Sequence, residues 1–171
     1  ARFEDLVRSL FCRRYNIKYG IFQCVNHAGN ETNTIRVGNE IIGFQAKYFK
    51  NEINDQIIIE SIITAKRRNP EQTKIIIYTN LTFGNPPIGQ RLTSKQKKIE
   101  DAANDNNITI EWSVDTMILD QVASVDWIYD VFFGTEPNLM SFLNEEIENT
   151  THILQPINSK IIHNNQEIKV N

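Results

Sequence analysis

The sequence predicts an α/β fold in which a mixed β-sheet is flanked by helices on both faces. Apolar residues at helical spacing alternate along the chain with short β-like runs. Residues 74–79 (KIIIYT) form a continuous apolar run, which is typical of a central strand covered on both faces. A two-residue turn pair, Gly38-Asn39, separates two further β-like segments and predicts a hairpin. Helices that alternate with strands in this way favour a sheet packed between helical layers.

The first part of the chain contains a helix followed by extended segments. Phe3, Leu6, Val7, Leu10 and Phe11 recur at helical spacing and predict an amphipathic helix. Residues 26–33 (NHAGNETN) have the composition of a turn. The expected elements are, in order, a helix at 2–13, a strand at 17–25, a turn at 26–33, and a hairpin with strands at 34–37 and 40–48.

Helices and strands alternate through the rest of the chain. Asn69-Pro70 closes a helix, and Thr93 with Gln96 forms a capping box that opens another. The expected elements are a helix at 52–68, a strand at 74–79, a Gly- and Pro-rich loop at 80–92, a helix from Thr93 to about 106, a strand at 108–112, and helices at 115–133 and 138–149, before an extended tail at 151–171.

Composition excludes several classes of protein. The longest apolar runs are three to four residues, far from the roughly 20 needed to span a bilayer. The N-terminus has no signal-peptide pattern, and two cysteines cannot form a disulfide framework or a zinc site. Because the chain starts at Ala1 and ends in a strand-like stretch, we expect a processed chain or a fragment of a longer protein.

Charge is distributed unevenly along the chain, whose formal net charge is −3. Residues 1–98 contain 16 Lys and Arg against 8 Asp and Glu, a balance of +8. Residues 99–171 contain 2 Lys and Arg against 13 Asp and Glu, a balance of −11. The asymmetry predicts an anionic partner for the first half, although the net charge alone would argue against one.

The stretch that carries chemistry is Gly29-Asn30-Glu31-Thr32 followed by residues 42–49 (IGFQAKYF). Because side chains alternate along a strand, Gln45 and Lys47 are expected on one face. Phe44, Ala46 and Tyr48 are expected to point into the opposite layer. Glu31, in the turn before the hairpin, is placed to add a carboxylate to the face of Gln45 and Lys47.

This set suits Mg²⁺-dependent hydrolysis of a phosphodiester. Mg²⁺ prefers hard oxygen ligands and usually takes one or two carboxylates from a protein. Glu31 is the expected anionic ligand, completed by the Gln45 side-chain oxygen and the Ala46 carbonyl. Lys47 is expected to orient the attacking water and stabilise transition-state charge. Because Gln45 is neutral, Glu4 on the first helix is the candidate that restores the missing charge, directly or through water.

The pattern Glu31…Gln45-x-Lys47 on a hairpin, preceded by Phe3-Glu4 in a helix, resembles the PD-(D/E)xK nuclease superfamily in its Mrr-like QxK branch. The match covers about residues 2–112 and implies a restriction-endonuclease-like core, in which Glu31 stands where Asp is usual. It looks most similar to the N-terminal nuclease domains of bacterial antiviral STAND NTPases, the AVAST systems. That likeness implies a nuclease domain at 1–150, with a helical extension at 113–150 and a linker at 151–171.

The resemblance also implies a function and partners. The expected activity is a Mg²⁺-dependent endonuclease, with Mn²⁺ as a substitute, that cleaves double-stranded DNA with little sequence preference. It would be the effector of a cytoplasmic bacterial antiphage sensor, without a membrane partner. The parent NTPase would oligomerise, with a tetramer expected, and bring sister nuclease domains together. The acidic second half would face solvent, sister domains or the parent protein.

Several cations are candidates for phosphate contact, each beside a plainer interpretation. Lys50 follows the site but is also expected as an ordinary solvated lysine. Lys66-Arg67-Arg68 ends a helix, where cations also suit the helix dipole. Arg91 and Lys95 lie at the start of a helix, where they could meet a phosphate.

Two other functions stay open at this stage. In the first, the chain is an inactive nuclease fold that serves in DNA binding or assembly. In the second, it retains metal-dependent phosphodiester hydrolysis but acts on RNA or branched DNA. Glu4 also has a plain alternative, because a glutamate in a first helical turn is often only a favourable partner of the helix dipole.

Overall fold

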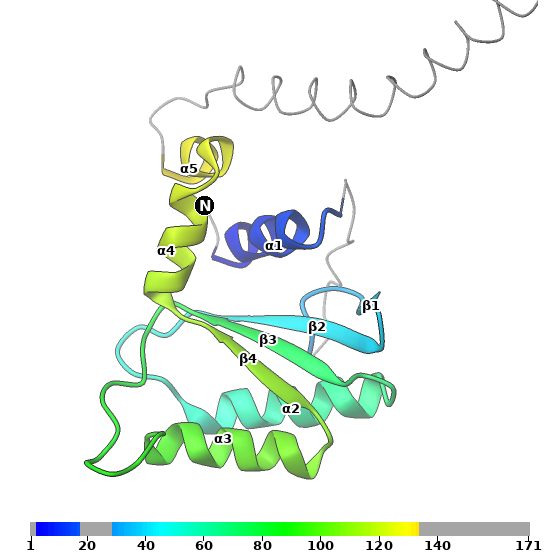
Figure 1. The fold of residues 1–171 in the computed structure, drawn as a ribbon, viewed down its shortest axis with the longest axis vertical. Helices are drawn as coiled ribbons and strands as arrows, with labels where there is room; N and C mark the ends of the chain where they lie inside the picture. The colour runs from blue at the N-terminus through cyan, green and yellow to red at the C-terminus, as the bar shows by residue number, and fades with distance from the viewer. Residues whose placement is uncertain (1–2, 18–28, 134–171) are drawn as a thin grey trace, which may run out of the picture. The chain divides into compact units, whose positions relative to one another are not determined.

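The computed structural model describes residues 3–17 and 29–133 (Figure 1). The helices are α1 (Phe3–Arg14), α2 (Asp55–Arg68), α3 (Ser94–Asp105), α4 (Asp115–Ala123) and α5 (Asp126–Phe133). The strands are β1 (Ile35–Val37), β2 (Glu40–Lys47), β3 (Lys74–Thr79) and β4 (Thr109–Ser113). The chain divides after Ser124 into two units, and α5 is the described part of the second.

The described strands form one mixed sheet in the order β1-β2-β3-β4. β1 and β2 are antiparallel, as the predicted hairpin requires, whereas β2, β3 and β4 run parallel. The α/β fold with a mixed sheet flanked by helices is therefore confirmed, and it is compatible with a restriction-endonuclease-like core. The carboxyl ends of the three parallel strands meet at one edge of the sheet, which is where ligands bind in open α/β sheets.

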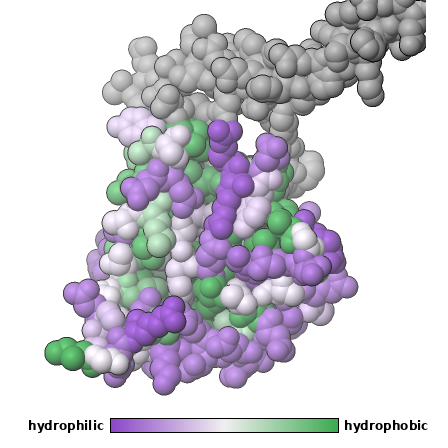
Figure 2. Space-filling view, in the orientation of Figure 1, coloured by the Kyte–Doolittle hydropathy of each residue, from purple (hydrophilic) through white to green (hydrophobic). Residues whose placement is uncertain are grey.

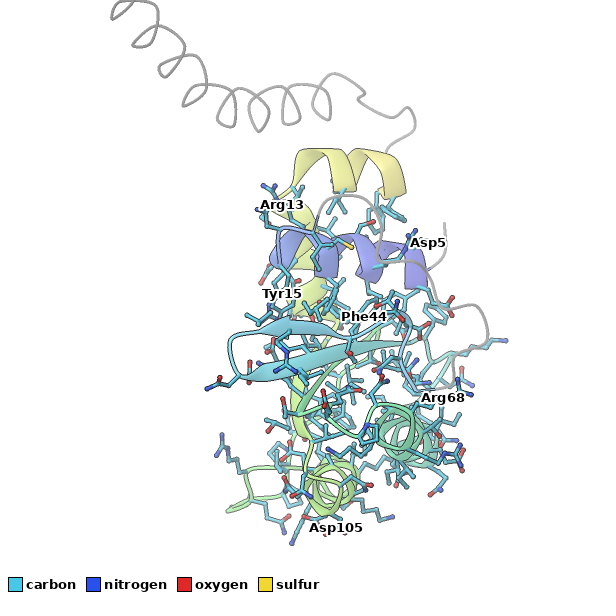
Figure 3. The ribbon with its side chains drawn as sticks, turned by 90° about the vertical axis from the view of Figure 1, so that its right-hand side faces the viewer. Asp5, Arg13, Tyr15, Phe44, Arg68 and Asp105 are labelled. Atoms are coloured by element: carbon cyan, nitrogen blue, oxygen red, sulfur yellow. The ribbon has the colours of Figure 1, made fainter. Side chains whose placement is uncertain are left out.

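Helices cover both faces of the sheet, with α2 and α3 on one side and α1 and α4 on the other (Figure 1). Ile75 and Ile77 of β3 pack against the buried residues of α2 and α3, such as Ile62 and Ile99. On the other face Phe44 of β2 points toward α1 (Figure 3), where its ring lies 4.5 Å from that of Phe11. Residues 75–79 are all buried, so the expectation of a strand covered on both faces is confirmed.

Local sequence accounts for where the helices begin. The Asn54 side chain accepts a hydrogen bond from Ile57 N and caps α2. Thr93 and Gln96 form the predicted capping box at the start of α3, with both of its hydrogen bonds present. Because Thr93 Oγ1 accepts from Gln96 N, that amide is already satisfied and is not free for a phosphate.

The structure divides one predicted helix of the second half into two. The single helix predicted at 115–133 is wrong, because α4 ends at Ala123 and α5 begins at Asp126. Ser124 caps α4, and its hydroxyl donates to the Gln121 carbonyl at 2.7 Å, a local bond that competes with a continuous helix. The predicted helix at 138–149, the tail at 151–171, the domain boundary at 150 and nearly all of the strand at 17–25 lie outside the described residues.

Membrane association through a helix was not expected. Among the described residues, no helix combines the length and apolarity needed to cross a bilayer.

The aromatic contact between β2 and α1 is expected to contribute to the free energy of unfolding. Phe44 is fully buried between Phe11 and Tyr78. We expect Phe44→Ala to lower the free energy of unfolding by about 3–5 kcal/mol, because the change leaves a cavity at the centre of the α1 layer. Urea denaturation measures the loss, with Tyr48→Ala as the control because Tyr48 is 70% exposed. A loss below about 1 kcal/mol for Phe44→Ala would contradict this packing.

Candidate active site

The site is built at the carboxyl end of β2. Gln45 pairs in register with Ile77, and Lys47 with Thr79, on the face covered by α2 and α3. Phe44 and Ala46 point to the opposite face, so the predicted alternation along the strand is confirmed for these four residues.

Tyr48 follows the end of β2 and differs from its prediction in part. Its ring contacts Phe3 of α1 edge-on at 5.8 Å, which is the expected side of the sheet. It is nevertheless 70% exposed, because the strand has ended and nothing described covers its outer surface. Tyr48 therefore lies at the rim of the α1 layer and not within it.

Hydrogen bonds of the Glu31 backbone and side chain hold this residue against Gln45 and Ala46. Its N–H donates to the Phe44 carbonyl at 3.0 Å, so the residue runs alongside β2. Its Oε1 accepts from the Ala46 N–H at 3.2 Å and from Gln45 Nε2. The structure thus brings together Glu31, Gln45 and Ala46, which the sequence placed in one site from positions 14 and 15 residues apart.

The turn that carries Glu31 is held by contacts that tolerate no side chain at two glycines. A Cβ on Gly29 would lie 2.4 Å from the backbone nitrogen of Ala65 in α2, and the φ of Gly29 is +106°. A Cβ on Gly43 would lie 2.3 Å from Asn30 Oδ1. Asn30 in turn donates to Gln72 Oε1 at 2.8 Å, in a buried amide pair. Glu31 is therefore positioned by its predecessor, which lies between Gly43 of β2 and Gln72.

Sequence reasoning missed Gln72. It named Asn30 only as part of the turn and considered Asn80 only as a possible substrate contact, so the structural roles of both were not predicted. Asn80 accepts from Phe49 N at 2.7 Å and donates to Phe49 O at 2.9 Å, which ties the segment after β2 to the end of β3. Gly43 inside a strand was the available signal, because such a glycine often marks a close approach of another part of the chain.

Burial opposes the ionisation of both Glu31 and Lys47. Burial raises the pKa of the Glu31 carboxyl above its ordinary value of 4.5, and the hydrogen bonds from Ala46 and Gln45 oppose that rise. The Glu4 charge raises the pKa of Glu31 further, whereas the Lys47 charge lowers it. Burial also lowers the pKa of the Lys47 ammonium below 10.5, against the effects of Glu31 and Glu4. Glu4 is thus close enough to act on both groups.

The oxygen atoms of this set fit a hard divalent cation. Gln45 Oε1 is buried and has no hydrogen-bond partner among the described residues, an arrangement that costs free energy. In the structure Gln45 Nε2, and not Oε1, faces Glu31. Rotating the amide by half a turn would set Oε1 beside the ionised carboxylate, and a cation between the two oxygens would make that arrangement favourable. Glu31, Gln45, the Ala46 carbonyl and Glu4 are the residues that would hold it.

The number of carboxylates also bears on the kind of metal. In the described part of the chain, no group of three or more His, Cys, Asp or Glu side chains is arranged to hold a metal ion. The candidate set offers two carboxylates, Glu31 and Glu4, with an amide and a carbonyl oxygen. Mg²⁺ commonly binds with one or two protein carboxylates and keeps several waters. These four ligands therefore suit Mg²⁺ better than a metal ion that requires three or more anionic ligands.

Two of the cations predicted to contact DNA have partners within the protein. Lys66 Nζ donates to the Gln72 carbonyl at 2.9 Å, near the start of β3. Lys95 Nζ contacts Glu52 at 2.8 Å and the Ile53 carbonyl at 3.0 Å, where it ties the start of α3 to the segment before α2. A phosphate at Lys95 would have to displace these contacts.

The other four predicted cations are exposed. Lys50 and Arg91 lie in loops that follow β2 and β3 at the same edge as Lys47, whereas Arg67 and Arg68 end α2 at its opposite end. Figure 3 labels Arg68 beside α2, which is seen end-on in that view. Position therefore favours Lys50 and Arg91 for contact with a substrate bound at Lys47, and DNA contact by all six cations stays a prediction.

The two charged halves of the sequence are not separate in space. Glu111 of the acidic half forms a salt bridge with Lys74 at 3.0 Å and another with Arg14. This cluster, with Tyr15 beside it, joins the end of α1 to the sheet and lowers the pKa of Glu111, because the two cations outweigh the effect of burial. The expectation that the acidic second half faces solvent, sister domains or the parent protein is therefore wrong for Glu111, because this residue pairs with cations of the first half.

No protein-family model and no curated protein matches the chain. The functional interpretation therefore depends on the residues of the site and on the resemblance they carry.

The crowding at Gly43 gives a prediction about the Glu31 turn. We expect Gly43→Ala to lower the free energy of unfolding by about 1–3 kcal/mol, because the new methyl group displaces Asn30. The same change in an Asn30→Ala background removes the nearest clashing atom and should cost less, with a coupling of about 1 kcal/mol. Urea denaturation of the four proteins measures this cycle, and strictly additive effects would show that Gly43 and Asn30 do not meet.

The raised pKa of Glu31 predicts a pH-dependent stability. A carboxyl whose folded pKa exceeds its unfolded value destabilises the fold as pH rises from about 4.5 through the folded pKa. Glu31→Gln keeps an acceptor for Ala46 but cannot ionise. We therefore expect the variant to gain stability relative to the original protein across that window and then to hold the gain to pH 8. Urea midpoints in EDTA measure the difference, and a gain that shrinks with rising pH would contradict the burial cost.

Proposed function

We propose that this chain is a Mg²⁺-dependent endonuclease that cleaves DNA phosphodiesters with little sequence preference. The observation that carries the proposal is the convergence of Glu31, Gln45 and Lys47 at the carboxyl end of β2. All three are partly or fully withdrawn from water, and the amide leaves one buried oxygen unpaired. Perturbed, partly buried titratable groups at a strand end are typical of catalytic sites. The PD-(D/E)xK resemblance adds the reaction class.

The proposed roles follow from charge and position. Bound Mg²⁺, or Mn²⁺ in its place, would supply Lewis-acid stabilisation of the phosphate oxygens and a more acidic water. Glu31, Glu4, the Gln45 oxygen and the Ala46 carbonyl would hold the ion. The Lys47 ammonium would donate hydrogen bonds to the attacking water and to the phosphate oxygens that gain charge in the transition state. Because burial weakens the competition from bulk water, each of these contacts acts more strongly than at the surface.

Affinity for DNA would come from phosphate contacts and would fall steeply with salt. Lys50 and Arg91 are the best-placed cations, since both lie at the edge that carries Lys47. A neutral glutamine in place of a third acid also leaves the site less negative, which favours the approach of an anionic backbone.

The biological setting is part of the proposal and derives from the resemblance. The domain would serve as the effector of a cytoplasmic bacterial antiphage sensor and would be activated when sister domains assemble, with a tetramer expected. A nonspecific nuclease must be silent until then, because free activity would damage its host. Met117 and Leu119, which are exposed on either side of the buried Ile118 in α4, are available for such contacts with sister domains or the parent NTPase.

Substitutions at the site test the chemistry. We expect Lys47→Ala and Glu31→Ala to reduce cleavage of plasmid DNA in Mg²⁺ by about 10²–10³-fold or more while the proteins stay folded. Arg36→Ala is the matched control, because Arg36 is an exposed cation of β1 that pairs with Glu71 away from the site. Gel assays with plasmid, linear DNA and RNA, each with Mg²⁺ or EDTA, measure the rates for monomers and for tethered oligomers.

The outcomes of this assay separate the candidate functions. Cleavage that persists in either site variant would show that these residues do not catalyse it. Cleavage of RNA alone would reassign the substrate. If tethered oligomers bind DNA but cleave nothing with Mg²⁺, the chain is a non-catalytic module for binding or assembly.

A further inference from the structure

We propose, on the basis of the proposed nuclease function, that Ile88 is an apolar wedge that enters the minor groove of DNA beside the cleaved phosphate. Ile88 is the most exposed of the large apolar side chains described, with a relative exposure of 106%. It lies at the tip of the loop between β3 and α3. In Figure 2 this tip is a hydrophobic projection beside hydrophilic surface.

The tip is a preformed turn. Gln90 N donates to the Pro87 carbonyl at 2.9 Å, and Gly89 has a φ of +81°. These are the features of a type II turn, in which Ile88 takes the first central position and glycine the second. Two prolines precede the turn and restrict its backbone further. Ile88 is therefore held out at the apex with little conformational freedom to lose on binding.

The base of the loop is anchored at both ends. Phe83 packs edge-on against Trp112 with ring centroids 4.7 Å apart, and Leu81 lies against the core beneath α2 and α3. At the other end the Thr93 capping box fixes the start of α3. Residues 84–91 between these anchors are all exposed, so the loop is a projection fixed at its two ends.

The loop begins beside the candidate site. Thr79, the last residue of β3, pairs in register with Lys47, and the next residue, Asn80, binds the backbone of Phe49. The seven residue steps from Leu81 to Ile88 span at most about 25 Å, which is less than one turn of B-DNA, about 34 Å. The tip therefore lies within one turn of B-DNA of the start of the loop, which is beside Lys47.

The chemistry of the tip favours DNA over a protein partner. A protein interface of ordinary size buries about 800 Å² on each side, whereas here one apolar side chain stands among Pro, Gly and polar residues. Minor-groove proteins insert single apolar side chains between base steps and unstack them. The minor groove, about 6 Å wide, admits a tight turn but no helix. Arg91, also exposed, follows three residues after Ile88, and a narrow minor groove attracts arginine.

The test measures binding and base unstacking together. The full chain, in a Lys47→Ala background that prevents cleavage, is titrated with 30-base-pair duplexes that carry the fluorescent base 2-aminopurine at different steps. We expect the 2-aminopurine signal to rise where the wedge enters. Ile88→Ser should bind about tenfold more weakly, since it removes one apolar contact, and should lose the fluorescence increase. Its salt dependence should stay unchanged, because no phosphate contact is lost.

The controls separate this proposal from the function on which it depends. Ile63→Ser removes an exposed isoleucine of α2 and should bind like the parent, and Ile88→Leu should retain the signal. An Ile88→Ser protein with unchanged affinity and fluorescence would overturn the wedge, while DNA cleavage by the original chain would leave the nuclease proposal standing. If the original chain neither binds nor cleaves DNA even as a tethered oligomer, both fail. If Ile88→Ser changes only the oligomeric state in sedimentation, the tip contacts a protein and the wedge is wrong.

Discussion

The turn that carries Glu31 packs closely against β2 because Gly43 has no side chain. The space that a Cβ would take is filled by Asn30, whose amide is fixed by Gln72, and Gly29 presses the same turn against the backbone of α2. This packing brings a turn, a central strand and a helix into one arrangement. The pairing of Glu31 with Gln45 and Ala46, and the closeness of Glu31 to Lys47, all follow from it.

The arrangement places opposite charges where neither is well solvated. Burial acts on Glu31 and Lys47 in opposite directions, so each group weakens the pKa shift of the other while both remain costly to ionise. Such a cost is compatible with a stable fold because the surrounding layers are apolar and fully packed. Sites of this kind commonly trade stability for chemistry, and the packed β3 strand supplies the compensating burial.

The sequence predicted those features that depend on local pattern. Alternation along β2 put Gln45 and Lys47 on one face, and the capping box at Thr93 marked the start of α3. Features that depend on distant partners were not predictable, since Asn30 and Gln72 are 42 residues apart. The break at Ser124 was missed because the apolar periodicity continues through it and only the serine hydroxyl marks the end of α4.

The loop between Phe83 and Thr93 also bears on how this fold can diversify. Its two ends are fixed by packing and capping, while residues 84–91 are exposed. Insertions or deletions within such a segment cost little closure entropy, about 0.6 kcal/mol for a doubling of its length. Natural variants of this chain can therefore differ in the length and tip of this loop without repacking the sheet or moving Glu31 and Lys47. Such changes would alter the molecular surface that the loop contacts.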